Sequence, residues 1–117
     1  GELPATFPRA ARLLNANQFT NVFQRGYFIR RHGGVLVRVV ENGGHVARIG
    51  VIVPKKGNKL AVRRNRIKRL ARDHFRLIRT HLKSVDIVVH VTGAVTDEEL
   101  MRILDQSLES LIEEQAC

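Results

Sequence analysis

Several features that other classes of protein need are missing from this chain of 117 residues. Its one cysteine, Cys117, is the last residue, which excludes an internal disulfide and a cysteine-based metal site. No apolar run reaches the roughly 18 residues of a membrane span. The beginning of the sequence, with Glu2 and Pro4, lacks the charged region and apolar stretch of a signal peptide. These absences predict a cytoplasmic protein, and the length predicts a single domain over residues 1–117.

Acidic residues are scarce over most of the chain. Residues 1–96 contain 19 Lys and Arg but only four Asp and Glu, whereas residues 97–117 contain one Arg and seven acids. The whole chain has a formal net charge of +9 and an isoelectric point near 11.0. Positive charge concentrated in one part of a chain indicates a polyanionic partner. Nucleic acid is the first candidate, and an anionic membrane is the second.

Hydrophobic periodicity predicts helices at both ends of the chain. The first is expected over residues 16–25, with Asn15 as its N-cap and Gly26 ending it in a left-handed conformation. The last begins at Thr96, because the sequence Thr-Asp-Glu-Glu is typical of a capping box. Its apolar positions form one stripe, which should be buried.

Four β-branched or apolar segments predict strands. They cover residues 27–29, 35–41, 45–53 and 85–91, and the last is a nearly continuous apolar run, as in a buried strand. Between the second and third, Asn42-Gly43-Gly44 predicts a hairpin turn. Three helices and about four strands in this order predict an α+β (α/β sandwich) fold with a single central sheet.

A helix expected from Leu60 to about His81 has the most unusual composition. Residues 59–83 contain ten Lys and Arg and a single acid, Asp73. Six positions at helical spacing should face the core: Ile67, Leu70, Ala71, His74, Phe75 and Ile78. Four basic residues at intervals of four form a cationic ridge, flanked by Arg69: Arg64, Lys68, Arg72 and Arg76.

Like charges at this spacing destabilise an isolated helix by about 0.2–0.5 kcal/mol per pair. A ligand that benefits from the charges would explain why they occur together. Guanidinium groups match phosphate oxygens bidentately, and each contact releases condensed counterions. The ridge therefore predicts nucleic-acid binding, with a solvated cationic face as the alternative.

The chain offers little for catalysis of its own. A metal-dependent nuclease needs several converging carboxylates, and the acids before the last helix are few and scattered: Glu2, Glu41, Asp73 and Asp86. The histidines show no ligand spacing, and His74 on the apolar stripe favours a core position. The segment 55–59 lacks the Gly-Lys-Ser/Thr ending of a phosphate loop. We therefore predict no catalytic residue, no metal ligand and no cofactor bound by the protein alone.

Aromatic residues are few, with five Phe, one Tyr and no Trp. Phe19 and Phe23 are four residues apart and share a face with Val22 on the first predicted helix. Such a pair is commonly part of a core. It can also line a groove in which unpaired bases stack, and the spacing leaves both possibilities open.

The segment Lys55–Leu70, KKGNKLAVRRNRIKRL, resembles the signature of the protein subunit of bacterial ribonuclease P. Its centre is the sequence RNRIKR at residues 64–69, and Arg72 and Phe75 follow at the family's spacing. Arg12-Leu13-Leu14, the Phe19–Gly26 segment and Arg48–Val51 are similar to family segments as well. The likeness covers about residues 8–112.

The resemblance implies a fold of order αβββαβα with a left-handed βαβ crossover, whereas the general rule predicts a right-handed one. It also implies a function, the endonucleolytic removal of the 5′ leader of precursor tRNA. The catalytic RNA subunit would perform the hydrolysis with Mg²⁺, and the protein would bind both that RNA and the leader. The implied partners are the catalytic RNA and precursor tRNA, with no membrane and no protein partner.

The resemblance assigns roles by position in the motif. Six residues would contact the catalytic RNA: Arg64, Asn65, Arg66, Lys68, Arg69 and Arg72. Lys55 and Lys56 match additional RNA-binding positions. Phe19 and Phe23 match the leader-binding cleft, which favours a functional role over a core one. Val37 stands where some members carry a leader-facing aromatic, so stacking would be lost there unless Tyr27 or Phe28 compensates. Two further hypotheses are a stand-alone RNA chaperone or ribosome-associated module and an autonomous nuclease.

Overall fold

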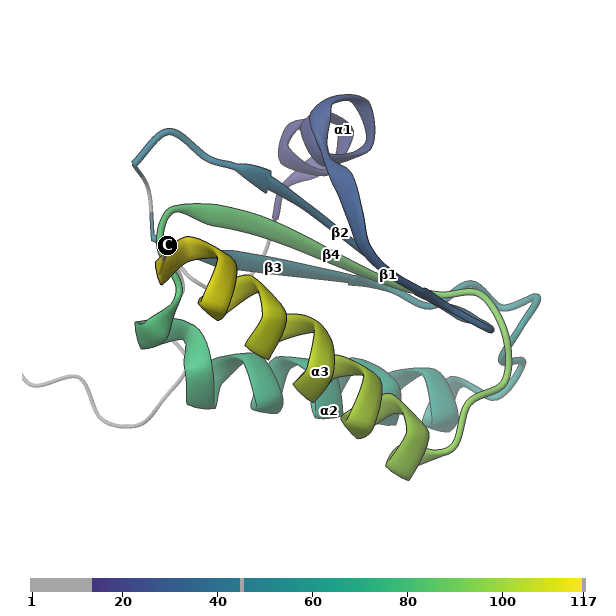
Figure 1. Ribbon diagram of the computed structural model, residues 1–117. Coiled ribbons are helices and arrows are strands. Elements are labelled where there is room, and N and C mark those ends of the chain that lie inside the picture. The colour runs from purple at the N-terminus through teal and green to yellow at the C-terminus, as the bar shows by residue number, and fades with distance from the viewer. Residues whose placement is uncertain (1–13, 45, 117) are drawn as a thin grey trace, which may run out of the picture.

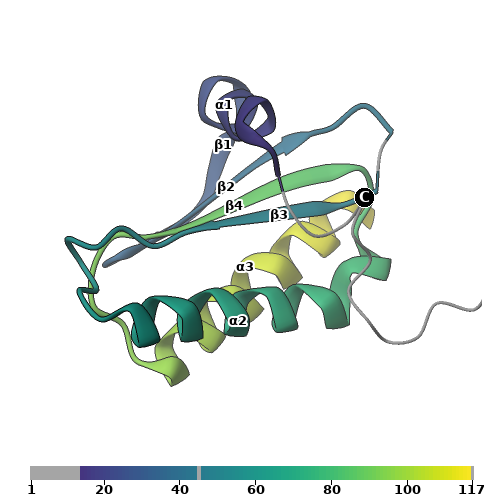
Figure 2. The same ribbon diagram turned by 180° about the vertical axis from the view of Figure 1, so that it is seen from behind.

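The computed structural model describes residues 14–44 and 46–116, which form three layers around one sheet (Figure 1). Helix α1 (Ala16–Arg25) covers one face of the sheet. Helices α2 (Ala61–Ile78) and α3 (Asp97–Ala116) lie side by side on the other face (Figures 1 and 2). The strands are β1 (Tyr27–His32), β2 (Val35–Glu41), β3 (Arg48–Ile52) and β4 (Val85–Val91), and a short 3₁₀ turn, η2 (Arg79–His81), follows α2. The predicted αβββαβα order is confirmed.

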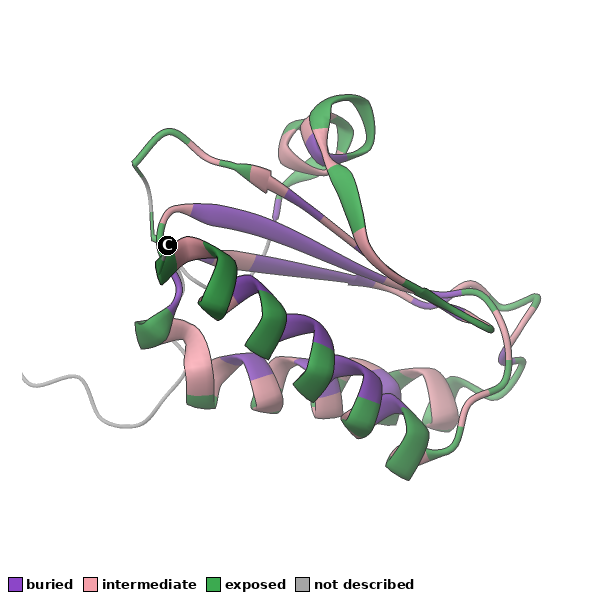
Figure 3. Cartoon of the chain, viewed as in Figure 1, coloured by how far each residue is buried: buried purple, intermediate pink, exposed green. Residues whose placement is uncertain are grey.

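The sheet has the order β1-β2-β4-β3, so its last strand lies inside it. β4 is antiparallel to β2 and parallel to β3. Its apolar sequence suits this place, because a strand between two layers is covered on both faces; Figure 3 shows it buried along most of its length. The predicted hairpin at Asn42-Gly43-Gly44 is wrong, because β4 separates β2 from β3. The observed hairpin joins β1 to β2, with Gly33 at a φ of 54°.

The connection from β3 through α2 to β4 is left-handed. β3 and β4 run in the same direction, and α2 passes beneath them (Figure 1). β3 lies behind β4 in Figure 1 and in front of it in Figure 2, which sets the hand of the crossover. This agrees with the expectation from the family resemblance and departs from the usual right-handed rule.

Two apolar clusters separate the three layers. The larger lies between the sheet and α2 and α3, and combines strand valines with Ile67, Ala71 and Phe75 of α2. The smaller lies beneath α1 and contains Leu14, Val22 and Val88, with Phe19, Val40 and Ile52 packed against it.

The position of Val37 corrects an expectation. Val37 is fully buried in the larger cluster, on the sheet face that α2 and α3 cover. It cannot face a leader beside α1, because successive residues of a strand point to opposite faces. Its neighbours Leu36 and Arg38 point to the α1 side instead.

The helix ends follow the capping residues predicted from the sequence. Asn15 Oδ1 accepts a hydrogen bond from Gln18 N at 2.9 Å, and Gln18 Oε1 accepts one from Asn15 N at 2.8 Å. Thr96 Oγ1 accepts one from Glu99 N at 3.1 Å in the capping box of α3. Gly26 ends α1 with a φ of −76°, so the predicted left-handed conformation is wrong. Glycine is required because a Cβ there would lie 2.4 Å from the Val22 carbonyl oxygen.

Candidate nucleic-acid interface

Helix α2 turns its apolar stripe to the sheet and presents basic side chains on one flank. At 3.6 residues per turn, positions spaced by four lie on the same side of a helix. Arg64, Lys68 and Arg72 are half-buried beside Ile67 and Ala71, whereas Asn65 and Arg69 are exposed. Long basic side chains can cover apolar surface with their stems while their charges reach water. We call this surface the basic ridge, and it consists of Arg64, Lys68, Arg69, Arg72 and Arg76.

The start of α2 adds to the positive potential of the ridge. The first turn has no acidic residue, and its N-cap, Leu60, makes no side-chain capping bond. Free amide groups and the helix dipole favour anions at such an end. Lys55 and Lys56 are exposed in the loop that leads into α2. The loop, the helix start and the ridge thus offer cations and amides to one polyanion.

The loop between β3 and α2 is fixed by close contacts. Arg64 donates hydrogen bonds to the carbonyl oxygens of Asn58 at 3.0 Å and Lys59 at 2.7 Å. The buried Asn58 side chain donates to the Gly93 carbonyl oxygen at 3.2 Å. A Cβ on Gly57 would lie 2.1 Å from the Thr92 carbonyl oxygen, so only glycine fits there. The predicted RNA-binding residues on both sides of the loop are therefore held by the fold.

Arg66 differs from the other predicted contacts. It lies on the α3 side of α2, away from the basic ridge, and its Nε donates to Asp97 Oδ2 at 2.7 Å. Arg63 donates to Asp97 Oδ1 at 2.5 Å. Hydrogen bonds from Arg66 and then from Arg63 hold the pKa of Asp97 below its usual value. The structure thus places five of the six predicted catalytic-RNA contacts together and gives Arg66 an acidic partner.

The two aromatic residues of α1 differ in exposure. Phe19 is half-buried, and its ring lies so close to Gly50 of β3 that a Cβ there would be 2.3 Å from Cζ. Phe23 is 38% exposed at the surface. Phe19 therefore packs α1 against the sheet, while Phe23 offers part of its ring to a ligand.

Arg38, on the same side of the sheet as α1, joins two aromatic rings. Its guanidinium carbon lies 4.7 Å from the ring centroid of Phe23 and 4.4 Å from that of Phe28. The guanidinium of Arg31 lies 4.6 Å from the Phe28 centroid. Phe28 is 36% exposed, so this cluster is open to solvent. We call Phe23, Phe28, Arg31 and Arg38 the aromatic patch, and aromatic faces with arginines are what unpaired bases stack on.

His90 of β4 borders the aromatic patch. Its ring centroid lies 6.4 Å from that of Phe23 in an edge-to-face arrangement. Burial, and then the nearby charge of Arg38, lower the pKa of His90 below its ordinary value. Sequence analysis offered Phe28 as one possible replacement for the aromatic missing at Val37, but missed Arg38 and His90 as members of this surface. The local signal was Arg38, a charge between the valines of β2.

The carboxylates of the described residues do not converge. Asp86 is buried and accepts two hydrogen bonds from Arg48, at 2.8 and 3.0 Å, and one from Asn42 at 3.0 Å. Asp73 is exposed on α2. No group of three His, Cys, Asp or Glu side chains in residues 14–44 and 46–116 could hold a metal ion. Glu2 lies outside the described residues, as do Arg12 and Leu13.

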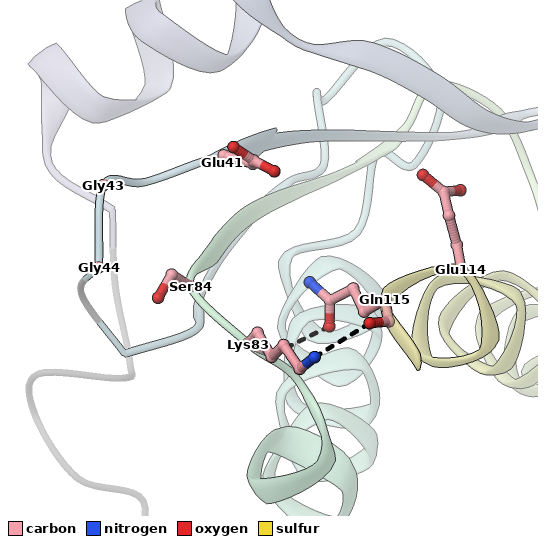
Figure 4. A pocket seen from close by; sticks show the side chains of 7 residues that line it. All are labelled: Glu41, Gly43, Gly44, Lys83, Ser84, Glu114 and Gln115. Carbon is pink, nitrogen blue, oxygen red and sulfur yellow. Dashed lines mark hydrogen bonds between the residues drawn. The ribbon is translucent and has the colours of Figure 1, made fainter. Parts of the chain in front are cut away.

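A hollow of about 440 Å³ lies between the loop after β2 and the end of α3 (Figure 4). Glu41 and Glu114 line it, and Lys83 donates hydrogen bonds to the Gln115 carbonyl oxygen at 3.0 Å and, from its backbone, to Gln115 Oε1 at 2.9 Å. The two carboxylates would repel a phosphate, so this hollow does not suit RNA.

Among the described residues, no helix has both the length and the apolar character to span a bilayer.

An α/β sandwich with this topology is the fold of solved ribonuclease P proteins. The chain is similar to the Staphylococcus aureus RNase P protein, with a TM-score of 0.74 and 26% identity over 87% of this chain and 95% of that one. It is similar to the Thermotoga maritima RNase P protein, with a TM-score of 0.67 and 27% identity over 86% of this chain and 96% of that one.

Sequence comparison gives the same family. The Ribonuclease P family model matches residues 7–115. The ribonuclease P protein component of Yersinia enterocolitica is 44% identical over 105 residues, which is 90% of this chain and 87% of the relative. That of Escherichia coli is 41% identical over the same shares. The chain belongs to the ribonuclease P protein family, as the segment Lys55–Leu70 indicated. Its role is therefore in ribonuclease P, an endoribonuclease of tRNA processing.

Proposed function

We propose that this chain binds the catalytic RNA of ribonuclease P through α2 and the unpaired 5′ leader of precursor tRNA through the aromatic patch. One observation gives the strongest support for two separate RNA-binding surfaces. The basic ridge lies on α2, whereas the aromatic patch lies on α1 and on strands β1 and β2, and α1 and α2 cover opposite faces of the sheet (Figures 1 and 2). The ridge holds cations without rings, which suits a phosphate backbone. The patch holds rings with cations, which suits unpaired bases.

The catalytic RNA is the partner proposed for α2 and the loop before it. A folded RNA presents its backbone phosphates at high density, and each neutralised phosphate releases a counterion. The proposed contacts are Arg64, Asn65, Arg66, Lys68, Arg69 and Arg72, with Lys55 and Lys56 in the loop. Arg64 supports this surface in two ways, because it carries a charge and closes the loop through Asn58 and Lys59.

The leader is the partner proposed for the α1 side of the sheet. Phe23 and Phe28 each leave more than a third of their surface exposed, and Arg38 holds them in one array. A base that stacks on an aromatic side chain contributes about 1–3 kcal/mol, and every base has a face that can stack. Mature tRNA has no leader, so this surface would distinguish the precursor from the product.

Hydrolysis is assigned in this proposal to the RNA subunit, with Mg²⁺ bound by the RNA. The described residues offer no group of three His, Cys, Asp or Glu side chains that fits a metal ion, so the proposed role of the protein is to bind and orient the two RNAs. The protein contributes positive charge, which lets the two RNAs approach at lower Mg²⁺ concentration. The relatives are bacterial, which supports a cytoplasmic site of action.

Reconstitution tests the proposal. The protein is combined with a bacterial ribonuclease P RNA and precursor tRNA at low Mg²⁺ concentration, and cleavage is followed with protein alone and RNA alone as controls. We expect efficient cleavage at the 5′ end only from the mixture. Metal-dependent cleavage by the RNA-free protein would instead support an autonomous nuclease. Binding without any stimulation of cleavage would support a chaperone or ribosome-associated module.

A further inference from the structure

We propose that Asp97 is a positioning residue that fixes Arg66 in the orientation in which it contacts a phosphate of the catalytic RNA. This inference rests on the proposed function of α2. Asp97 is the first residue of α3, and Arg66 lies 31 positions earlier on α2. No pattern along the sequence relates the two residues.

The geometry leaves Arg66 able to bind a second anion. Both Nε and Nη2 of Arg66 lie 2.7 Å from Asp97 Oδ2. A guanidinium has five N–H groups, so about three of them remain for another acceptor. The side chain of Arg66 is 46% exposed, compared with 28% for Arg63. The carboxylate thus holds one edge of the Arg66 guanidinium and leaves the rest open to solvent.

Arg63 holds the carboxylate from its other side. It donates to Asp97 Oδ1 at 2.5 Å and to the Val95 carbonyl oxygen at 2.5 Å. Each carboxylate oxygen therefore has its own arginine, and Arg63 is tied to the backbone just before α3. Of these two arginines, Arg63 anchors the arrangement and Arg66 faces outward.

The stability of α3 does not account for this arrangement. Thr96 and Glu99 already cap the helix, because Glu99 N donates to Thr96 Oγ1 at 3.1 Å. Acidic side chains in the first turn stabilise a helix through its dipole. Glu98 and Glu99 supply such negative charge as well as Asp97. The charge of Asp97 could interact favourably with the dipole of α3 without any contact between Asp97 and α2. Its contacts with both arginines point to a role on α2.

Two effects of Asp97 on RNA binding oppose each other. Its negative charge repels a phosphate, but the repulsion between exposed charges is weak in the high dielectric of water. Its hydrogen bonds remove the freedom of a long side chain, which binding would otherwise have to remove. For a flexible arginine at the surface, we expect the gain from a side chain that is already ordered to exceed the loss from charge repulsion. The loss of Asp97 should therefore weaken binding although it makes the protein more positive.

The test compares Asp97→Asn with Glu98→Gln, each of which removes one negative charge from the first turn of α3. Glu98 is exposed and neighbours Asp97, which makes it the matched control. Affinity for the catalytic RNA is measured at several salt concentrations, and thermal unfolding shows whether each variant folds. We expect Asp97→Asn to weaken binding about three- to tenfold, and its salt slope to be shallower by up to about 0.9. Glu98→Gln should bind as tightly as the wild type or more tightly.

A second comparison uses Arg66→Ala as the background. If Asp97 acts through Arg66, Asp97→Asn should weaken binding no further once Arg66 is absent. Equal effects of Asp97→Asn and Glu98→Gln, or tighter binding with a steeper salt slope for Asp97→Asn, would overturn the inference. So would an undiminished effect in the Arg66→Ala background. If the wild type itself fails to bind the catalytic RNA, the proposed function fails instead.

Discussion

Replacing Phe23 by leucine separates the binding role of the aromatic patch from its packing role. Leucine retains much of the buried apolar surface of Phe23, so the cost to folding should stay below about 1.5 kcal/mol. It removes the face on which a leader base can stack, which is worth about 1–3 kcal/mol. Because 1.4 kcal/mol corresponds to a factor of ten, affinity for precursor tRNA should fall about 5- to 150-fold. Affinity for mature tRNA should not change.

The assay measures binding of precursor and mature tRNA to the enzyme assembled with the catalytic RNA. Phe75→Leu is the matched control, since Phe75 is fully buried in the larger core cluster. We expect the control to lower the free energy of unfolding and to leave the ratio of precursor to mature affinity unchanged. If Phe23→Leu leaves that ratio at the wild-type value, the aromatic patch does not receive the leader.

Three further predictions concern charge. The affinity for the catalytic RNA should fall with salt along a log–log slope of about −4 to −5 if about six cations neutralise phosphates; a slope near zero would show that the basic ridge faces only water. Asp86→Ala should lower the free energy of unfolding by about 3–5 kcal/mol in a denaturant titration, since it leaves Arg48 poorly solvated without its carboxylate; a loss below about 1 kcal/mol would contradict this. Burial lowers the pKa of His74 and His90 in the folded protein. Below about pH 6.5 the unfolded chain therefore takes up protons more readily than the folded one, and the free energy of unfolding should decrease as the pH is lowered. His74→Gln with His90→Gln should flatten this dependence in denaturant titrations over pH 5–8, and an unaltered dependence would assign it to other groups.

Local chemistry in the sequence was enough to predict the helices. Asn15 with Gln18 and Thr96 with Glu99 set the starts of α1 and α3 where they were expected, because both caps use residues three positions apart. Intervals of four predicted the buried stripe and the basic ridge of α2. The strands were also located, although β1 is longer than residues 27–29 and β3 is shorter than residues 45–53.

Strand pairing could not be predicted in this way. The sequence at 42–44 has favourable turn chemistry, and Gly43 and Gly44 do adopt positive φ values of 73° and 95°. A turn, however, does not determine which strands pair. β4 competes for the same edges and offers an apolar surface on both faces. In the sheet, β4 pairs with β3 across 38 positions of the sequence and with β2 across at least 44.

The candidate interface likewise depends on contacts between residues far apart in the sequence, which sequence analysis could not predict. The aromatic patch depends on the register of β1 with β2, in which Phe28 lies opposite Arg38 and a bulge follows before Arg30. Nothing local specifies that bulge. The contact between Arg66 and Asp97 depends on how α2 and α3 pack, so sequence analysis treated Arg66 as one of a uniform set. Residues whose partners lie nearby in sequence were predicted, and those with distant partners were not.

The inner position of β4 has a consequence for how the protein is made. Until residue 91 has left the ribosome, β3 has no neighbour in the sheet and β2 has only β1. Unpaired strand edges rich in valine favour association with other chains. The crossover also means that α2, with its many like charges, emerges before the strand that completes the sheet above it. A chain cut short between α2 and β4 would therefore carry the whole RNA-binding signature without the strand that completes the sheet.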